Sequence, residues 1–130
     1  MRIVLDTNIL VSATQWPASS AVKTIKRLRE KGVSFFVSEP ILEEFQEVLC
    51  RDFDYSSSEA SAIVFLVLRF ASVVEVKSVV SVVRDDPDDD KVLACAVDSS
   101  ATHIISYDRH LLRLGTFKGI KIVKPEELRE

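Results

Sequence analysis

The stretch RIVLDTN, residues 2–8, gives the clearest single indication of the fold. It opens with a short, β-branched run that stops at Asp6. Runs of this kind are typical of strands that are buried on both faces of a sheet. Such strands belong to parallel sheets, so helices should follow them and cover both sides.

Similar runs recur along the chain and alternate with segments of helical spacing. Pro17 should break any helix in residues 11–20, and the β-branched segment 73–83 is ambiguous. The alternation predicts an α/β fold, a three-layer α/β/α sandwich with a central parallel sheet. The predicted strands are residues 2–5, 33–38, 102–106 and 120–123, and the predicted helices are residues 18–31, 39–50, 56–72, 89–100 and 111–115.

The bulk composition indicates one compact domain spanning residues 1–130. The chain is 47% hydrophobic, which is too apolar for a disordered protein. No apolar run approaches the roughly 20 residues needed to span a bilayer, and Asp6 interrupts any signal-peptide core, so we expect a cytoplasmic protein. A net charge of −3 argues against non-specific nucleic-acid binding through overall charge, although it permits a local basic surface.

Several acids should gather at one edge of the predicted sheet, because ligands of open α/β sheets bind beyond the carboxyl ends of the strands. Asp6 directly follows the first strand, and Asp108 lies two residues past the strand 102–106. Glu43 and Glu44 belong to the helix that starts just after the second strand. Both project about 100–120° from the apolar stripe of that helix, so helical spacing hardly separates them.

The stretch RDDPDDDKVLACAV, residues 84–97, adds five aspartates in six positions. On a helical projection the apolar stripe of this segment centres near 70°, with Asp89 at about 60° and Asp90 at about 160°. Asp89 therefore shares the direction of the buried face. Asp88 suits a helix N-cap and Asp90 suits the helix dipole, and acids are favoured in first turns for these structural reasons alone.

Unpaired carboxylates in one place repel and raise one another's pKa, and a divalent cation relieves that repulsion. Oxygen ligands suit Mg²⁺ or Mn²⁺, and such ions support hydrolysis at phosphorus. The two cysteines, Cys50 and Cys95, lack CxxC spacing, which argues against zinc.

Three stretches together resemble the PIN domain. More closely, the chain is similar to the small prokaryotic PIN-family proteins assigned as toxins of toxin–antitoxin pairs, the VapC-like ribonucleases. The resemblance covers nearly the whole chain, and the order of its motifs is specific as a set. The stretches are IVLDTNILVSA (3–13), VSEPILEEFQEVL (37–49) and DPDDDKVLACAVDSSATHIISYDRHLL (86–112).

The resemblance implies which acids carry the chemistry. It assigns the aspartate of Asp-Thr-Asn, the glutamate before Phe45, the aspartate three and four residues before an apolar pair, and the last aspartate. Relatives are expected to have Asn at position 90, so Asp90 competes with its neighbour for the third assignment. The implied acids are Asp6, Glu44, Asp89 and Asp108.

Neighbouring polar residues have supporting roles in this interpretation. Thr7 or Asn8 would orient Asp6 or a bound water, or act only as a helix cap or turn residue. Ser106 matches the hydroxyl position before the last aspartate, and Asp90 could assist its neighbour. Tyr107 could narrow the mouth of the site, stack on a base, or simply pack. The supporting residues are thus Thr7, Asn8, Asp90 and Ser106.

The implied activity is that of a metal-dependent endoribonuclease acting on single-stranded or structured RNA. Three of the acids would hold one Mg²⁺ or Mn²⁺ ion, and Asp108 would assist a second ion or position water. A metal-activated water would attack the phosphodiester, so no nucleophilic side chain is needed. Candidate RNA contacts are Arg109, His110 and Arg113.

The apolar helix in residues 59–71 bears on partners. It lacks a polar face, as in helices that are buried all round. Either this chain covers it, or a homodimer or docked antitoxin does.

Two other functions are compatible with parts of the pattern. A PIN fold could serve as a catalytically silent RNA- or protein-binding module, although all four acids are present. A receiver-type magnesium-binding signalling domain would need paired acids after the first strand, where this chain has Asp6 alone.

Overall fold

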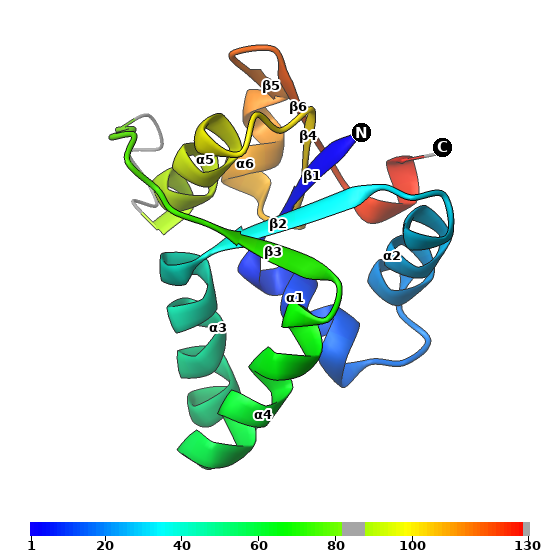
Figure 1. The fold of residues 1–130 in the computed structure, drawn as a ribbon, viewed down its shortest axis with the longest axis vertical. Helices are drawn as coiled ribbons and strands as arrows, with labels where there is room; N and C mark the ends of the chain where they lie inside the picture. Colours follow the sequence, from blue (N-terminus) through cyan, green and yellow to red (C-terminus); the bar gives the residue numbers. More distant parts are fainter. Residues whose placement is uncertain (82–87, 129–130) are drawn as a thin grey trace.

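The computed structural model describes residues 1–81 and 88–128 and contains a six-stranded sheet in the order β3-β2-β1-β4-β6-β5. Figure 1 shows α1 to α4 below β2 and β3 in that view and α5 and α6 above them. The predicted three-layer fold is confirmed, and a short antiparallel strand, β5, is added at one edge. The strands are β1 (Arg2–Leu5), β2 (Ser34–Ser38), β3 (Ala71–Val74), β4 (His103–Ile105), β5 (Thr116–Phe117) and β6 (Ile120–Val123). The helices are α1 (Thr7–Gln15), α2 (Ser20–Glu30), α3 (Glu39–Asp52), α4 (Ser57–Leu68), α5 (Asp88–Asp98), α6 (Arg109–Leu114) and the 3-10 turn η1 (Pro125–Glu127).

The centre of the sheet is the most buried part of the fold. In β1, Ile3, Val4 and Leu5 are fully buried, as expected for a strand that is covered on both faces. This strand pairs in parallel with β2 on one side and β4 on the other. The opening apolar run of the sequence is therefore the central strand of the sheet.

The chain reverses its direction of travel across the sheet between β1 and β4. It first passes outward from β1 to β2 and β3, and it later adds β4 and β6 on the opposite side of β1. In open α/β sheets, ligands bind in the crevice that such a switch point leaves at the carboxyl ends of the strands. Asp6 follows β1 at this place, and Asp108 follows β4.

Helix α1 was not expected from the sequence. Asp6 caps it by accepting a hydrogen bond from Thr7 N, so the helix begins directly after β1. Ile9, Leu10 and Val11 then pack into the core. Pro17 does not disrupt this helix, because α1 ends at Gln15, two residues before the proline.

Among the described residues of the ambiguous segment 73–83, Val73 and Val74 alone belong to a strand, and residues 82 and 83 lie outside the described part of the chain. β3 ends at Val74 at the open edge of the sheet, and residues 75–81 have no regular structure. Asp98, at the end of α5, holds this segment by accepting hydrogen bonds from Lys77 N (2.6 Å) and Ser78 N (2.9 Å).

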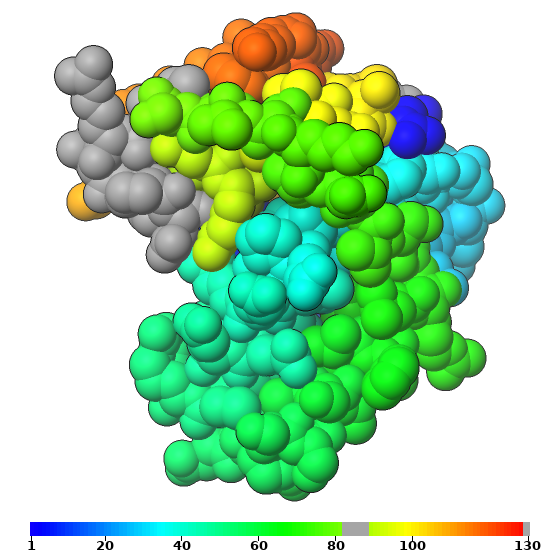
Figure 2. All heavy atoms as spheres, turned by 60° about the vertical axis from the view of Figure 1, so that its left-hand side comes forward, coloured from blue at the N-terminus to red at the C-terminus, as the bar shows by residue number. Residues whose placement is uncertain are grey.

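Helix α4 begins with a capping box, in which Ser56 and Glu59 exchange hydrogen bonds. Burial of this apolar helix within one chain, one of the two alternatives, is not observed. Only Ala60 and Val67 are buried, and the side chain of Phe65 is 69% exposed. Figure 2 shows the green surface of α4 and β3 running along one face of the molecule.

None of the helices in the described part of the chain is long and apolar enough to cross a membrane.

Candidate metal site

A pocket of about 440 Å³ lies beyond the carboxyl ends of the strands, and it brings together the four acids that the sequence singles out. Each comes from a different element. Asp6 follows β1, Glu44 lies on α3, Asp89 lies in the first turn of α5, and Asp108 caps α6. Because α5 leads into β4, its first turn lies at the edge where β4 ends.

Asp6 is the most constrained of these acids. Its side chain is 4% exposed and accepts hydrogen bonds at both oxygens. Oδ1 accepts from Thr7 N at 2.7 Å, while Oδ2 accepts from Ser106 Oγ at 2.5 Å and from Asn8 Nδ2 at 3.3 Å. Thr7 and Asn8, the two residues suggested to orient Asp6, both contact its carboxylate, and so does Ser106, which the sequence suggested only as a supporting hydroxyl.

The surroundings of Asp6 disfavour its charge. Burial raises the pKa of its carboxyl from the ordinary 3.8 to about 6. The hydrogen bonds from Ser106 and Thr7 oppose that change, and the nearby charges of Glu44 and Asp108 add to it. A cation in the pocket would remove both causes of the rise, because it would neutralise the charge and replace lost solvation.

Ser106 connects two of the acids. Its hydroxyl is fully buried, donates to Asp6 and accepts from Asp108 N at 2.9 Å. Oδ1 of Asp108 in turn accepts from the first amides of α6, His110 N at 2.8 Å and Leu111 N at 3.2 Å. The helix cap and the serine thus fix Asp108 from both its backbone and its side chain.

Glu44 also lines the pocket and is half-buried. Its Oε1 accepts a hydrogen bond from Thr7 Oγ1 at 2.5 Å, which ties α3 to the start of α1. Glu43, which helical spacing could not separate from Glu44, is exposed and lines a different pocket with Glu47 and Cys50.

Lys91 is a residue of this region that sequence reasoning missed. Its Nζ lies 3.5 Å from Oε2 of Glu44, and both side chains are mostly buried. On the helical projection Lys91 points away from the apolar stripe of α5, so spacing gave no sign of this contact. The contact exists because α3 and α5 pack against each other.

The choice between Asp89 and Asp90 has a clear structural counterpart. Asp89 is 5% exposed and lines the pocket, whereas Asp90 is half-buried and does not line it. Asp88 was expected at the N-cap of this helix. The helix begins at Asp88, so Asp88 is the first residue of α5 and not the N-cap residue before it. Asp85 and Asp86 lie outside the described residues.

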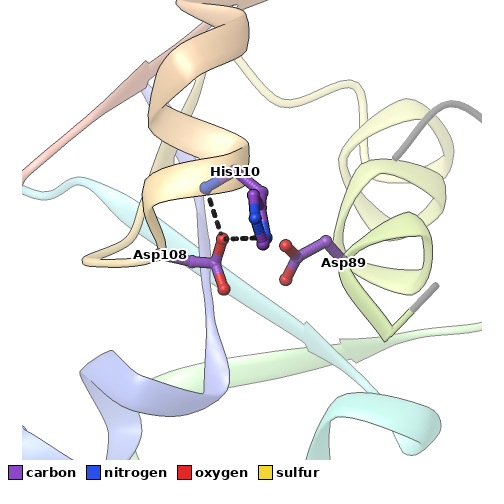
Figure 3. A group of neighbouring side chains, drawn as sticks. All are labelled: Asp89, Asp108 and His110. Atoms are coloured by element: carbon purple, nitrogen blue, oxygen red, sulfur yellow. Dashed lines mark hydrogen bonds and ion pairs between the residues drawn. The ribbon is translucent and has the colours of Figure 1, made fainter. Parts of the chain in front are cut away.

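His110 joins two of the acids, although the sequence suggested it only as an RNA contact. One ligand atom from each of Asp89, Asp108 and His110 lies within 4.8 Å of the others. Figure 3 shows these side chains pointing toward one another from α5 and from the start of α6. The Nδ1 atom of His110 is 3.9 Å from Oδ1 of Asp108.

The chemistry of these donors fits a hard divalent cation. Carboxylate oxygens are the ligands that Mg²⁺ and Mn²⁺ prefer, and one imidazole nitrogen is compatible with Mn²⁺. The other predicted RNA contacts, Arg109 and Arg113, are exposed on α6 just past Asp108, outside the pocket itself.

Apolar side chains form another part of the pocket wall. Val11 and Trp16 come from α1 and the residue after it, and Val48 and Phe53 come from α3 and the residue after it. Tyr107 also lines the pocket, and its backbone N–H donates to Asn8 Oδ1 at 3.1 Å.

Comparisons with known proteins agree with the fold. The fold is similar to a chain in the crystal structure of VapBC2 from Rickettsia felis bound to a DNA fragment from their promoter. That likeness has a TM-score of 0.69 at 14% sequence identity and covers 94% of this chain and 97% of that one. The search of curated proteins found no match. The sequence model of the PIN domain, PIN_3, matches residues 2–110, and the chain therefore belongs to the PIN domain family.

Proposed function

We propose that this protein is a Mg²⁺- or Mn²⁺-dependent endoribonuclease that hydrolyses RNA phosphodiesters, and that it is the toxin of a toxin–antitoxin pair. The observation that carries the proposal is the meeting of Asp6, Glu44, Asp89 and Asp108 in one pocket at the switch point of the sheet. Four carboxylates from separate elements do not gather for packing, because their mutual repulsion opposes folding.

In this proposal Asp6, Glu44 and Asp89 hold one ion, and Asp108 assists a second ion or positions water. A bound ion supplies a water of lowered pKa and stabilises negative charge on the departing oxygen. The chain's own contribution is to orient the carboxylates and to hold them close together in one pocket.

The polar residues around the acids do this orienting work. Ser106 and Asn8 direct Oδ2 of Asp6, and Thr7 holds both Asp6, through its amide, and Glu44, through its hydroxyl. Partners of this kind tune metal affinity by fixing the ligands. The exposed Arg109 and Arg113, next to Asp108, are in a position to attract RNA phosphates without entering the pocket.

The exposed apolar face of α4 supports a protein partner. Phe65, Leu66 and Leu68 all lie on it with more than a third of their surface exposed. We propose that a second copy of the chain covers this face in a homodimer. The toxin role also requires an antitoxin, and a toxin that cleaves RNA would act in the cytoplasm.

The direct test is RNA cleavage by the purified chain in the presence of Mg²⁺ or Mn²⁺. We expect cleavage that chelation by EDTA abolishes and that Asp6→Asn reduces below detection while leaving the fold intact, as circular dichroism would show. A chain that binds RNA or a protein but leaves RNA uncut would instead be a silent binding module. A crystal soaked with Mn²⁺ would identify the ligands independently of activity.

A further inference from the structure

We infer that the apolar wall of the metal-site pocket binds an unpaired RNA base, which stacks on Trp16. This wall consists of Val11, Trp16, Val48 and Phe53. The inference rests on the proposed function, because it names the part of the substrate that occupies the pocket beside the acids. It restricts the substrate to RNA whose base at this position is unstacked and unpaired.

The exposure of Trp16 is the first argument. Its side chain is 51% exposed, although it lines the same pocket as Val11, which is 8% exposed. Leaving a large aromatic surface in water forgoes the stabilisation that burial would provide. An aromatic platform beside a phosphate-processing site is useful when a base covers it.

The rigidity of Trp16 is the second argument. Its backbone N–H donates to Ser12 O at 3.1 Å, and its carbonyl accepts from Ser19 N at 3.0 Å. The ring of Phe53 meets the indole edge to face, with centroids 5.7 Å apart and an interplanar angle of 70°. Because backbone and ring are both held, little conformational entropy would be lost when a base stacks on the indole.

The division of the pocket is the third argument. Asp6, Asp89 and Asp108 lie at the starts of α1, α5 and α6, whereas Trp16 and Phe53 follow the ends of α1 and α3. A nucleotide has the same two-part character, with an anionic phosphate and a flat, apolar-faced base. Stacking accepts every base, since each has a π-face, so Trp16 would contribute affinity without strict sequence preference.

The carboxylate of Asp52 also lines this pocket and could repel an RNA backbone. Arg51 engages both of its oxygens, through Nε at 2.9 Å and a terminal nitrogen at 3.1 Å. That pairing offsets the negative charge at the rim on the side of the apolar wall. The pocket therefore remains open to a base there.

The chain offers a direct spectroscopic test, because Trp16 is its only tryptophan. Asp6→Asn protein with Mg²⁺ would be titrated with hexaadenylate, and with an abasic strand carrying the same number of phosphates. We expect saturable quenching of Trp16 fluorescence by hexaadenylate and much weaker quenching by the abasic strand. Equal effects of the two strands, or no effect of either, would overturn the inference and leave the apolar wall to a protein side chain.

Variants of Trp16 provide the second measurement, with binding followed by the anisotropy of a fluorescently labelled hexaadenylate. Stacking on one aromatic ring corresponds to roughly 1–3 kcal/mol, so Trp16→Leu should weaken binding about 5- to 150-fold. Trp16→Phe should retain most of the affinity, because it keeps a ring. Val79→Ala, which trims an exposed apolar side chain outside the pocket, should have no effect. If the Trp16→Leu variant is folded and binds labelled hexaadenylate with wild-type affinity, the inference is contradicted.

These outcomes separate the inference from the proposed function. RNA cleavage without base-dependent quenching would leave the ribonuclease proposal standing and remove the stacking site. Base-dependent quenching by a chain that never cleaves RNA would support the stacking site and remove the ribonuclease proposal.

Discussion

Ser106 donates its hydroxyl hydrogen to Oδ2 of Asp6 across 2.5 Å, although the two residues are 100 positions apart in the sequence. The parallel register of β1 and β4 brings these two residues together. Leu5 pairs with Ile105, each is the last residue of its strand, and Asp6 and Ser106 are the residues that follow them. The same hydroxyl accepts a hydrogen bond from Asp108 N, so its own hydrogen is directed to Asp6. Ser106 thus fixes the distance between two acids of the pocket.

The first prediction is that Ser106→Ala weakens metal binding and cleavage without unfolding the protein. The hydrogen bond from Ser106 lowers the pKa of Asp6. Losing this bond should raise that pKa, so the acid limb of the pH–rate profile should move to higher pH. Residues that orient metal ligands typically contribute roughly 10–100-fold to affinity or activity.

The measurement for Ser106 is the pH dependence of Mn²⁺ affinity and of RNA cleavage. Ser106→Thr should restore most of the activity, because it returns the hydroxyl. Ser99→Ala, which alters another buried serine outside the pocket, serves as the control. A uniform loss of activity at every pH would indicate a packing role only.

The second prediction concerns the stability of the metal-free protein. The pKa of Asp6 is about 6 in the folded chain and 3.8 ordinarily, so the folded state binds this proton more tightly than the unfolded state does. The free energy of unfolding should therefore fall as pH rises from 4 to 6, by about 3 kcal/mol from this group, and then level off.

Urea unfolding of the wild type and Asp6→Asn in EDTA, between pH 4 and 7, measures this effect. Asp6→Asn should lose this pH dependence and gain stability relative to the wild type toward pH 7. Millimolar Mn²⁺ should raise the stability of the wild type at pH 7 by linkage. Parallel pH profiles for the two proteins would mean that Asp6 ionises normally in the folded state.

The sequence predicted well those features that depend on local periodicity. Strand β1 and the acid at its end could be placed because a strand covered on both faces has an uninterrupted apolar sequence. Asp89 could be singled out from its neighbours because helical geometry fixes the direction of each side chain in a first turn. Both inferences needed only residues close together in the chain.

Individual side-chain contacts between helices could not be predicted. Lys91 meets Glu44 because α3 packs on α5, and Trp16 meets Phe53 because the ends of α1 and α3 converge. Helix α1 is not predicted, because Pro17 interrupts the segment 11–20, whereas in the fold this proline follows the end of the helix at Gln15. The antiparallel strand β5 has only two residues, too few for a periodic pattern.

The third prediction uses two pairs of adjacent acids as matched controls. Glu44 and Asp89 line the pocket, while their neighbours Glu43 and Asp90 do not. Glu44→Gln and Asp89→Asn should each weaken Mn²⁺ binding at least tenfold, because each removes a charged ligand. Glu43→Gln and Asp90→Asn should change it by a few-fold at most. Isothermal titration calorimetry of the four variants would show a reversed order if the neighbouring positions supply the ligands.

The fourth prediction is that Lys91 competes with the metal for Glu44. Its Nζ lies 3.5 Å from Oε2 of that carboxylate, so binding an ion there requires the ammonium to share or give up the contact. Lys91→Met should then tighten Mn²⁺ binding a few-fold, in line with the modest strength of such pairs. Lys23→Met, at an exposed position on α2, should leave the affinity unchanged. Weaker Mn²⁺ binding in Lys91→Met would show that the lysine holds Glu44 in place for the ion and does not compete with it.

The fifth prediction concerns the exposed face of α4. An apolar surface of this kind is usually covered in solution, and the proposed cover is a second copy of the chain. Phe65→Asp would place a charge at the residue of α4 with 69% exposure, so it should convert a dimer into a monomer. Multi-angle light scattering of the eluted protein measures the mass directly. Val79→Asp is the matched control, because Val79 is 95% exposed but lies beyond β3, outside α4. A wild-type chain that is already monomeric would exclude the homodimer and leave the face to the antitoxin.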